Sequence, residues 1–146
     1  MNRRKSSPTD GEPLTMLHPT QFEVNEAWLA FKLNETPICT ESDGDFDCIA
    51  LIDAASGFIL GNAFAPAGEG EPSTMEVRRL LEEARTHRQE LPQTLILPSG
   101  QFDRTLAAEA ERLGIAVVRV PEDELLVFIG EARASFKEHF GGGGVQ

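Results

Sequence analysis

The sequence predicts a single α/β domain with a mixed β-sheet, and two patterns support this prediction. An apolar strand over 47–53 turns within a few small residues and returns as a second apolar strand over 58–64. Helical segments then alternate with short apolar strands at 94–97 and 115–120. This alternation is typical of a mostly parallel sheet with right-handed crossovers, to which the hairpin adds an antiparallel edge. We therefore expect one domain over residues 20–140, with about four strands and flanking helices.

The composition of the strands predicts their order in the sheet. Both faces of the strand 47–53 are apolar, which favours a central position with helices on each side. The returning strand contains Gly61 and Asn62, which favours a peripheral position or a bulge. The expected order across the sheet is 58–64, 47–53, 94–97 and 115–120.

Three helices are expected after the hairpin. The first begins with a capping box at 73–76, in which the serine and glutamate side chains satisfy the first free amides. The second ends at Gly114, which suits the left-handed conformation that closes many helices. The third lies within 125–140, and the glycines that follow it predict a flexible tail over 141–146.

The N-terminal part of the chain is divided into a tail and a short helix. Residues 1–19 are polar and rich in proline, so we expect them to be disordered. Val24, Trp28 and Phe31 are spaced i, i+4 and i+7, which predicts a short amphipathic helix over 22–33.

The overall charge argues against a nucleic-acid partner. The chain has 13 Lys and Arg residues against 24 Asp and Glu residues, giving a net charge of −11. Such a surface repels phosphate backbones, and the only positive cluster is Arg3, Arg4 and Lys5 in the predicted tail.

Neither the apolar runs nor the cysteines indicate a membrane or secreted protein. No apolar run is long enough to span a bilayer, and the N-terminus lacks the apolar core of a secretion signal. Cys39 and Cys48 match no common metal motif and are expected to be free thiols. We therefore expect a soluble, cytoplasmic protein.

Candidate site residues follow from the predicted sheet. Ligands of such sheets bind at the carboxyl ends of the parallel strands. Three groups of residues are expected to converge there: Asp53 with Ser56, Ser99 with Gln101, and the acidic segment 122–124. Asp53, Ser56, Ser99 and Gln101 are the candidate ligand contacts. Asp53 also has a purely structural interpretation, because an aspartate before such a turn commonly accepts hydrogen bonds from the turn amides.

Two segments carry a family resemblance. Ile52–Leu60 resembles the opening hairpin of retroviral integrase and transposase cores. Leu95–Phe102, continuing to Ala110–Ile115, is similar to the second catalytic segment of those cores. The resemblance extends from Asp47 to Val120 and implies a ribonuclease H-like fold. In that fold the carboxylate that ends the first strand usually binds a catalytic Mg²⁺.

The resemblance implies an incomplete metal site. Asp53 matches the first metal-binding aspartate, whereas Pro98 falls where the second aspartate belongs. The third acid, on the last helix, matches Glu124 or Glu131. Because a shared metal ligand is missing, the chain resembles a degenerate core, similar to small bacterial domains with a trimmed ribonuclease H-like fold.

Three functions follow from these observations. The first is a non-catalytic binding or interaction module, without cofactor or metal, whose partner is a protein or a small molecule. The second is a Mg²⁺-dependent phosphoryl-transfer enzyme, nuclease-like or transposase-like, centred on Asp53 with Glu122, Glu124 or Glu131 as partners. The third is a regulatory domain that binds a small molecule through the polar contacts named above.

Overall fold

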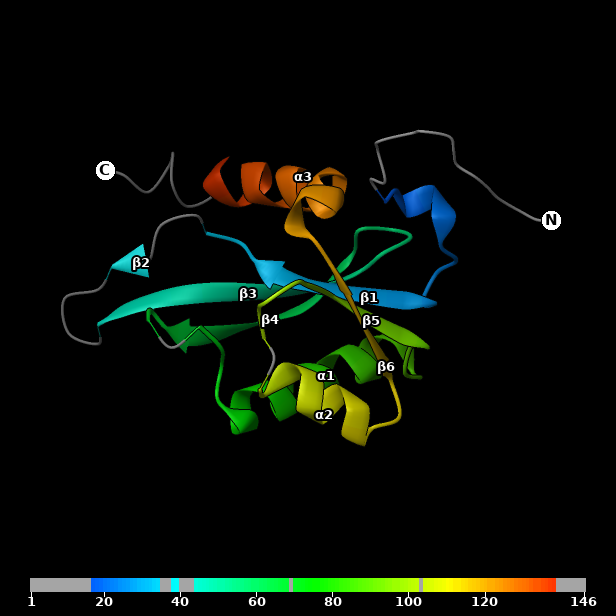
Figure 1. Cartoon of the computed structure of the whole chain (residues 1–146), viewed down its shortest axis with the longest axis horizontal. Helices are drawn as coiled ribbons and strands as arrows, with labels where there is room; N and C mark the ends of the chain where they lie inside the picture. The colour runs from blue at the N-terminus through cyan, green and yellow to red at the C-terminus, as the bar shows by residue number, and fades with distance from the viewer. Residues whose placement is uncertain (1–16, 35–37, 40–43, 69, 103, 139–146) are drawn as a thin grey trace.

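The computed structural model describes residues 17–34, 38–39, 44–68, 70–102 and 104–138 (Figure 1). Most of the predicted N-terminal tail and the whole of the predicted glycine-rich tail lie outside these ranges. A 3-10 turn, η1 (Pro19–Gln21), is the first described element.

Within these ranges, six strands form one mixed sheet. They are β1 (Ala27–Lys32), β2 (Ile38–Cys39), β3 (Asp45–Asp53), β4 (Ile59–Pro66), β5 (Thr94–Pro98) and β6 (Ala116–Val120). β3 pairs antiparallel with β4 on one side, and with β1 and the short β2 on the other. β5 and β6 extend the sheet beyond β1, parallel to it. The predicted hairpin is therefore confirmed, and a bulge between Leu51 and Ile52 shifts its register.

The predicted helix over 22–33 is wrong, because most of this segment is the central strand β1. All five residues from Ala27 to Phe31 are at most 1% exposed, so the segment has no polar face to give to solvent. Such a continuous apolar run belongs to a strand covered on both faces. Val24, which the helical spacing included, is 61% exposed and lies in a turn before the strand.

This correction changes the position of the hairpin in the sheet. The segment 47–53 belongs to the second long strand instead of the first, and β1 lies between it and β5. The three antiparallel strands β1, β3 and β4 thus precede the parallel pair β5 and β6. The expected order of strands lacked β1.

Helices cover both faces of the sheet (Figure 1). They are α1 (Thr74–Arg88) and α2 (Leu106–Arg112) on one face, and α3 (Leu126–Phe136), preceded by the 3-10 turn η2 (Glu122–Leu125), on the other. The Ser73 hydroxyl caps α1 by accepting from the Glu76 amide at 3.2 Å. Gly114 follows α2 with a φ of +87°, as predicted for a residue that closes a helix.

The sheet separates two hydrophobic cores. Trp28, Leu51 and Leu80 belong to the core under α1 and α2, and Leu29, Ile96 and Ile129 to the core under α3. The apolar stripes of the sequence predict that seven residues are buried. Six of them are buried, namely Ile49, Leu51, Leu80, Ile96, Leu106 and Ile129. The seventh, Val118, is 43% exposed, because β6 is an edge strand.

The two cysteines lie in different environments. Cys39 is exposed, whereas Cys48 is buried on β3, and this burial raises the pKa of the Cys48 thiol to about 11. Within the described ranges, no helix is both long and apolar enough to cross a membrane.

Candidate functional site

Asp53 lies at the opposite end of the sheet from the other predicted site residues. It pairs with Trp28 at the start of β1, because β3 runs antiparallel to β1. Ser99 and Gln101 follow the end of β5, and Glu122 follows the end of β6, two strands that run parallel to β1. The expected convergence of Asp53 and its neighbour Ser56 with these residues is therefore wrong.

The Asp53 carboxylate is saturated by hydrogen bonds. It is 0% exposed. Oδ1 accepts from the Asn25 amide at 2.7 Å, and Oδ2 accepts from the amide and the hydroxyl of Ser56 at 2.9 and 2.7 Å. The Arg88 guanidinium lies 3.7 Å from Oδ2 and packs over the Phe58 ring. Asp53 therefore holds the hairpin turn, as its structural interpretation predicted, and also joins it to the turn before β1 and to the end of α1.

Among the described residues, the two remaining acids proposed for catalysis form no metal-holding group with Asp53. Glu124 belongs to η2, where its carbonyl accepts from the Leu17 amide, and Glu131 is exposed on α3. Across the described ranges, no group of three or more His, Cys, Asp and Glu side chains is arranged to hold a metal ion.

A pocket of about 350 Å³ lies at the carboxyl ends of β1, β5 and β6. These parallel strand ends are where ligands bind in open α/β sheets. Its lining residues come from β1, β3, the loops after β4 and β5, η2 and α3; they are Lys32, Asp47, Gly70, Gln101, Phe102, Glu122 and Arg133. Of the predicted ligand contacts, Gln101 lines the pocket, and the exposed Ser99 lies two residues before it.

One wall of the pocket is a chain of polar contacts. Glu122 Oε1 accepts from Gln101 Nε2 at 3.0 Å, and Glu122 Oε2 lies 3.3 Å from Arg133 Nη2. Arg133 Nε in turn donates to the Lys32 carbonyl at 2.9 Å. These contacts tie the ends of β1, β5 and β6 to α3, so this wall is built from the strand ends and the α3 layer.

The opposite wall is formed by β1 and β3. Lys32 pairs with Ile49, so Asp47 lies diagonally across from it on the same face of the sheet. Asp47 is 7% exposed, and its Oδ1 accepts from Asn34 Nδ2 at 3.0 Å. Asn34 Oδ1 then accepts from the Cys48 amide at 2.7 Å. Asp47 is thus fixed by a neutral amide that is itself held by the backbone of β3.

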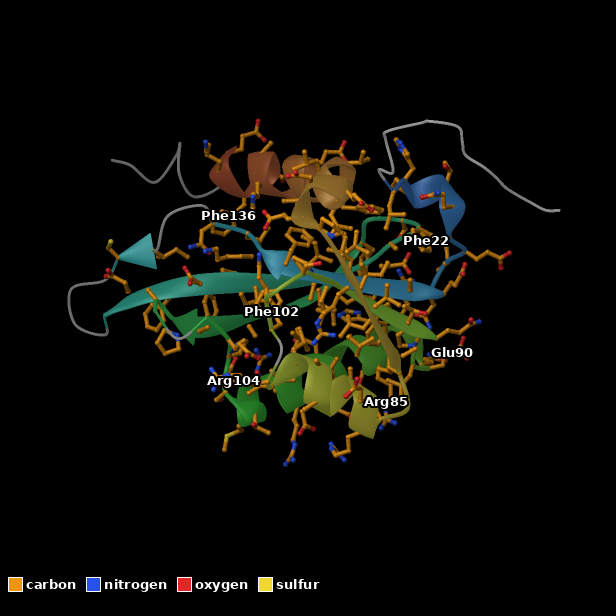
Figure 2. The ribbon with its side chains drawn as sticks, in the orientation of Figure 1. Phe22, Arg85, Glu90, Phe102, Arg104 and Phe136 are labelled. Carbon is orange, nitrogen blue, oxygen red and sulfur yellow. The ribbon has the colours of Figure 1, made fainter. Side chains whose placement is uncertain are left out.

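The turn that presents Gln101 contains a strained residue. Phe102 has a φ of +59°, a left-handed conformation that is unusual for a bulky side chain. Its side chain is 3% exposed and packs in the core between the sheet and the α1–α2 layer (Figure 2). Such strain costs on the order of 1–3 kcal/mol and is concentrated at functional sites.

Glu71 fastens the loop beside the pocket to the start of α2. Its carboxylate accepts from the Arg104 amide at 2.9 Å and from the Thr105 amide and hydroxyl at 2.6 and 2.8 Å. Burial acts to raise the pKa of Glu71, but these hydrogen bonds outweigh it and lower the pKa. The loop carrying Gly70 is therefore held against the pocket.

Comparison with known proteins identifies the fold only. No family model and no curated protein matches the chain. Among solved structures, the catalytic core domain of BIV integrase is 12% identical to this chain, with a TM-score of 0.50. The match covers 78% of this chain and 68% of the integrase chain. The HTLV-2 integrase catalytic core domain in complex with magnesium is 10% identical and has the same TM-score. That match covers 79% of this chain and 69% of the HTLV-2 chain.

A third structure is similar over more of this chain. The simian T-cell lymphotropic virus intasome in complex with PP2A regulatory subunit B56 gamma is 14% identical and has a TM-score of 0.52. The match covers 91% of this chain but only 46% of that one. These likenesses confirm the predicted ribonuclease H-like fold class.

The residues of the pocket do not fit the magnesium ion that this fold implies. β1 ends in Lys32 and β5 ends in Pro98, so neither of these strand ends supplies a carboxylate. The carboxylates of Asp47 and Glu122 are already bonded, to Asn34 and to Gln101 and Arg133. A divalent cation here would face an ammonium and a guanidinium group instead of a cluster of oxygen ligands.

The structure also explains why sequence reasoning missed Lys32, Asp47 and Arg133. The helix assigned to 22–33 hid the fact that Lys32 ends a strand, and Asp47 was read only as the start of the hairpin. The signal for Lys32 was the unbroken apolar run that precedes it. Arg133 had no such signal, because only the packing of α3 brings it to the strand ends.

Proposed function

We propose that this chain is a non-catalytic binding domain with the ribonuclease H-like fold, and that the pocket at the ends of β1, β5 and β6 binds a small molecule. The observation that carries this proposal is Lys32. Lys32 is the last residue of β1 and lines the pocket. In a metal-dependent phosphoryl-transfer enzyme of this fold, the resemblance implies a carboxylate at the end of the first strand. Two-metal catalysis requires carboxylates close enough to share ions roughly 4 Å apart.

The dimensions and lining of the pocket support a small ligand. Its volume of about 350 Å³ falls within the range of ligand pockets. Residues with charged and amide side chains line it, together with the aromatic residue Phe102. A few polar groups around an apolar surface are the usual means by which a pocket orients a small molecule.

The enzyme alternative centred on Asp53 receives no support from this geometry. The Asp53 carboxylate is fully buried and already accepts hydrogen bonds from Asn25 and Ser56. Asp47 and Asp53 are six residues apart on β3, which corresponds to roughly 20 Å at about 3.4 Å per residue. Asp53 and the acids of the pocket are thus too far apart to share a metal ion.

Thermal unfolding with a ligand panel tests the proposal. We would scan the wild type, Lys32→Met and Lys137→Met with pools of amino acids, nucleosides, sugar phosphates and short carboxylic acids. A ligand at a hundred times its Kd stabilises the native state by about 2.7 kcal/mol, which raises the melting temperature measurably. We expect one pool to stabilise the wild type and Lys137→Met, but not Lys32→Met. If no pool stabilises the wild type more than Lys32→Met, the proposed function fails.

Divalent metals are expected to leave the stability unchanged. A Mg²⁺ or Mn²⁺ ion in the pocket would lie beside Lys32 and Arg133, whose positive charges repel it. The melting temperature in millimolar metal should therefore equal the melting temperature in EDTA. Differential scanning calorimetry provides the measurement. A large metal-dependent rise that disappears in Asp47→Asn or Glu122→Gln would instead favour the phosphoryl-transfer enzyme.

Nucleic acid is expected not to bind at physiological salt. The net charge is −11, and arginines on the described surface are neutralised by neighbours: Arg78 and Arg112 both pair with Glu109, and Arg79 pairs with Glu76. Few cations are left to contact phosphates. Fluorescence anisotropy with labelled DNA and RNA checks this. Micromolar binding that survives deletion of residues 1–19 would contradict it.

A further inference from the structure

Two opposite charges face the same pocket from adjacent strands. Side chains alternate between the faces of a strand, and Trp28 and Ala30 place Lys32 on the α1–α2 side of β1. Ile49 and Leu51 place Asp47 on the same side of β3. In the described part of the chain, no ion pair joins Lys32 and Asp47, and the neutral Asn34 amide is the partner identified for the Asp47 carboxylate.

The Asp47 carboxylate is nearly buried and makes no direct contact with a cationic side chain among the described residues. A carboxylate withdrawn from water needs an opposite charge as well as hydrogen bonds to offset its lost hydration. Asp47 is 7% exposed and accepts from a neutral group. A ligand that brings a cationic group to Asp47 would supply the missing charge.

The opposite wall of the pocket adds little net charge. Glu122 and Arg133 form an ion pair, and Gln101 donates to the same carboxylate. A ligand bearing only negative charge would gain Lys32 but would be repelled by Asp47. A ligand bearing only positive charge would be attracted by Asp47 but repelled by Lys32. Repulsion of the wrong charge pattern is one way in which sites achieve specificity.

We infer that the ligand of the pocket is a zwitterion of the amino-acid type, with its carboxylate toward Lys32 and its ammonium toward Asp47. This inference rests on the proposed function, since it names the ligand class of the same pocket. A volume of about 350 Å³ accommodates a free amino acid with its side chain. The two charged groups orient the ligand in the pocket.

Isothermal titration calorimetry of the full chain with the free amino acids tests the inference. For the amino acid that binds best, we would also titrate the matched amine, which lacks the carboxylate, and the matched acid, which lacks the ammonium. Each analogue is expected to bind at least about tenfold more weakly, because it leaves one of the two charges without a partner.

The variants have matched controls within the chain. Lys32→Met and Asp47→Asn are each expected to weaken amino-acid binding by at least about tenfold. Lys137→Met removes an exposed lysine elsewhere, and Asp45→Asn removes an exposed carboxylate from the same strand, so both should bind like the wild type. Circular dichroism of each variant separates lost binding from lost folding, and a variant that is not folded is replaced by Lys32→Gln or Asp47→Ser.

The outcomes separate this inference from the proposed function. If amino acids fail to bind while inorganic phosphate, a simple carboxylate or a simple amine binds in a Lys32-dependent manner, the pocket is a ligand site and the zwitterion assignment is wrong. The assignment is also overturned if the analogue without the ammonium binds as well as the amino acid. If no compound of any class binds, the proposed function itself fails.

Discussion

Replacing Asp53 with Ala is expected to lower the free energy of unfolding by about 3–5 kcal/mol, as breaking a buried charge pair does. The substitution leaves the amides of Asn25 and Ser56 without their acceptor and removes the charge beside Arg88. Asp53→Asn should cost less, because an amide keeps one acceptor oxygen but puts an NH₂ group where donors already point. Denaturant unfolding followed by fluorescence measures both effects, since the single tryptophan, Trp28, pairs with Asp53 across β1 and β3.

An exposed aspartate of the same strand provides the control. Asp45→Ala should change the free energy of unfolding by less than about 0.5 kcal/mol, as is usual at surface positions. Ligand binding to the Asp53 variants should be unchanged under conditions where they remain folded. If Asp53→Ala were as stable as the wild type but failed to bind the ligand, Asp53 would belong to the functional site and our structural interpretation would be wrong.

The hairpin and the role of Asp53 in its turn could be predicted because both depend on neighbouring residues. An aspartate followed by small residues and Gly57 specifies a turn from local hydrogen bonds alone. The fold class followed from the same hairpin and from the alternation of helices and strands after it. The central strand β1 was harder to predict, because a strand buried on both faces has no period of two. Two of its large apolar residues, Trp28 and Phe31, then matched a helical spacing with Val24, which lies before the strand, by chance.

The position of the site depended on contacts that the sequence does not encode locally. Gln101 and Glu122 were correctly placed at one end of the sheet, because both follow strands of a parallel pair. Asp53 was placed there too, because its strand was taken to run in the same direction. Direction within a sheet is set by pairing between distant segments. One misassigned strand, β1, therefore moved Asp53 to the wrong end and hid Lys32.

The two cores predict a second large effect on stability. Leu51→Ala and Ile96→Ala are each expected to destabilise by about 2–5 kcal/mol, because both side chains are buried and truncation leaves a cavity. Val118→Ala is the control, since its side chain is 43% exposed on the edge strand and little apolar surface is lost. The midpoint of denaturant unfolding should fall for the first two variants with an unchanged slope.

The double variant Leu51→Ala, Ile96→Ala tests whether the sheet separates two independently packed layers. Leu51 lies in the core under α1 and α2, and Ile96 lies in the core under α3, with β1 between their strands. Side chains that share no partners should give additive losses, within roughly 0.3–0.5 kcal/mol. A single unfolding transition should persist, because both layers pack on the same strands. A large coupling energy would contradict this arrangement, since it requires the two side chains to contact a common neighbour.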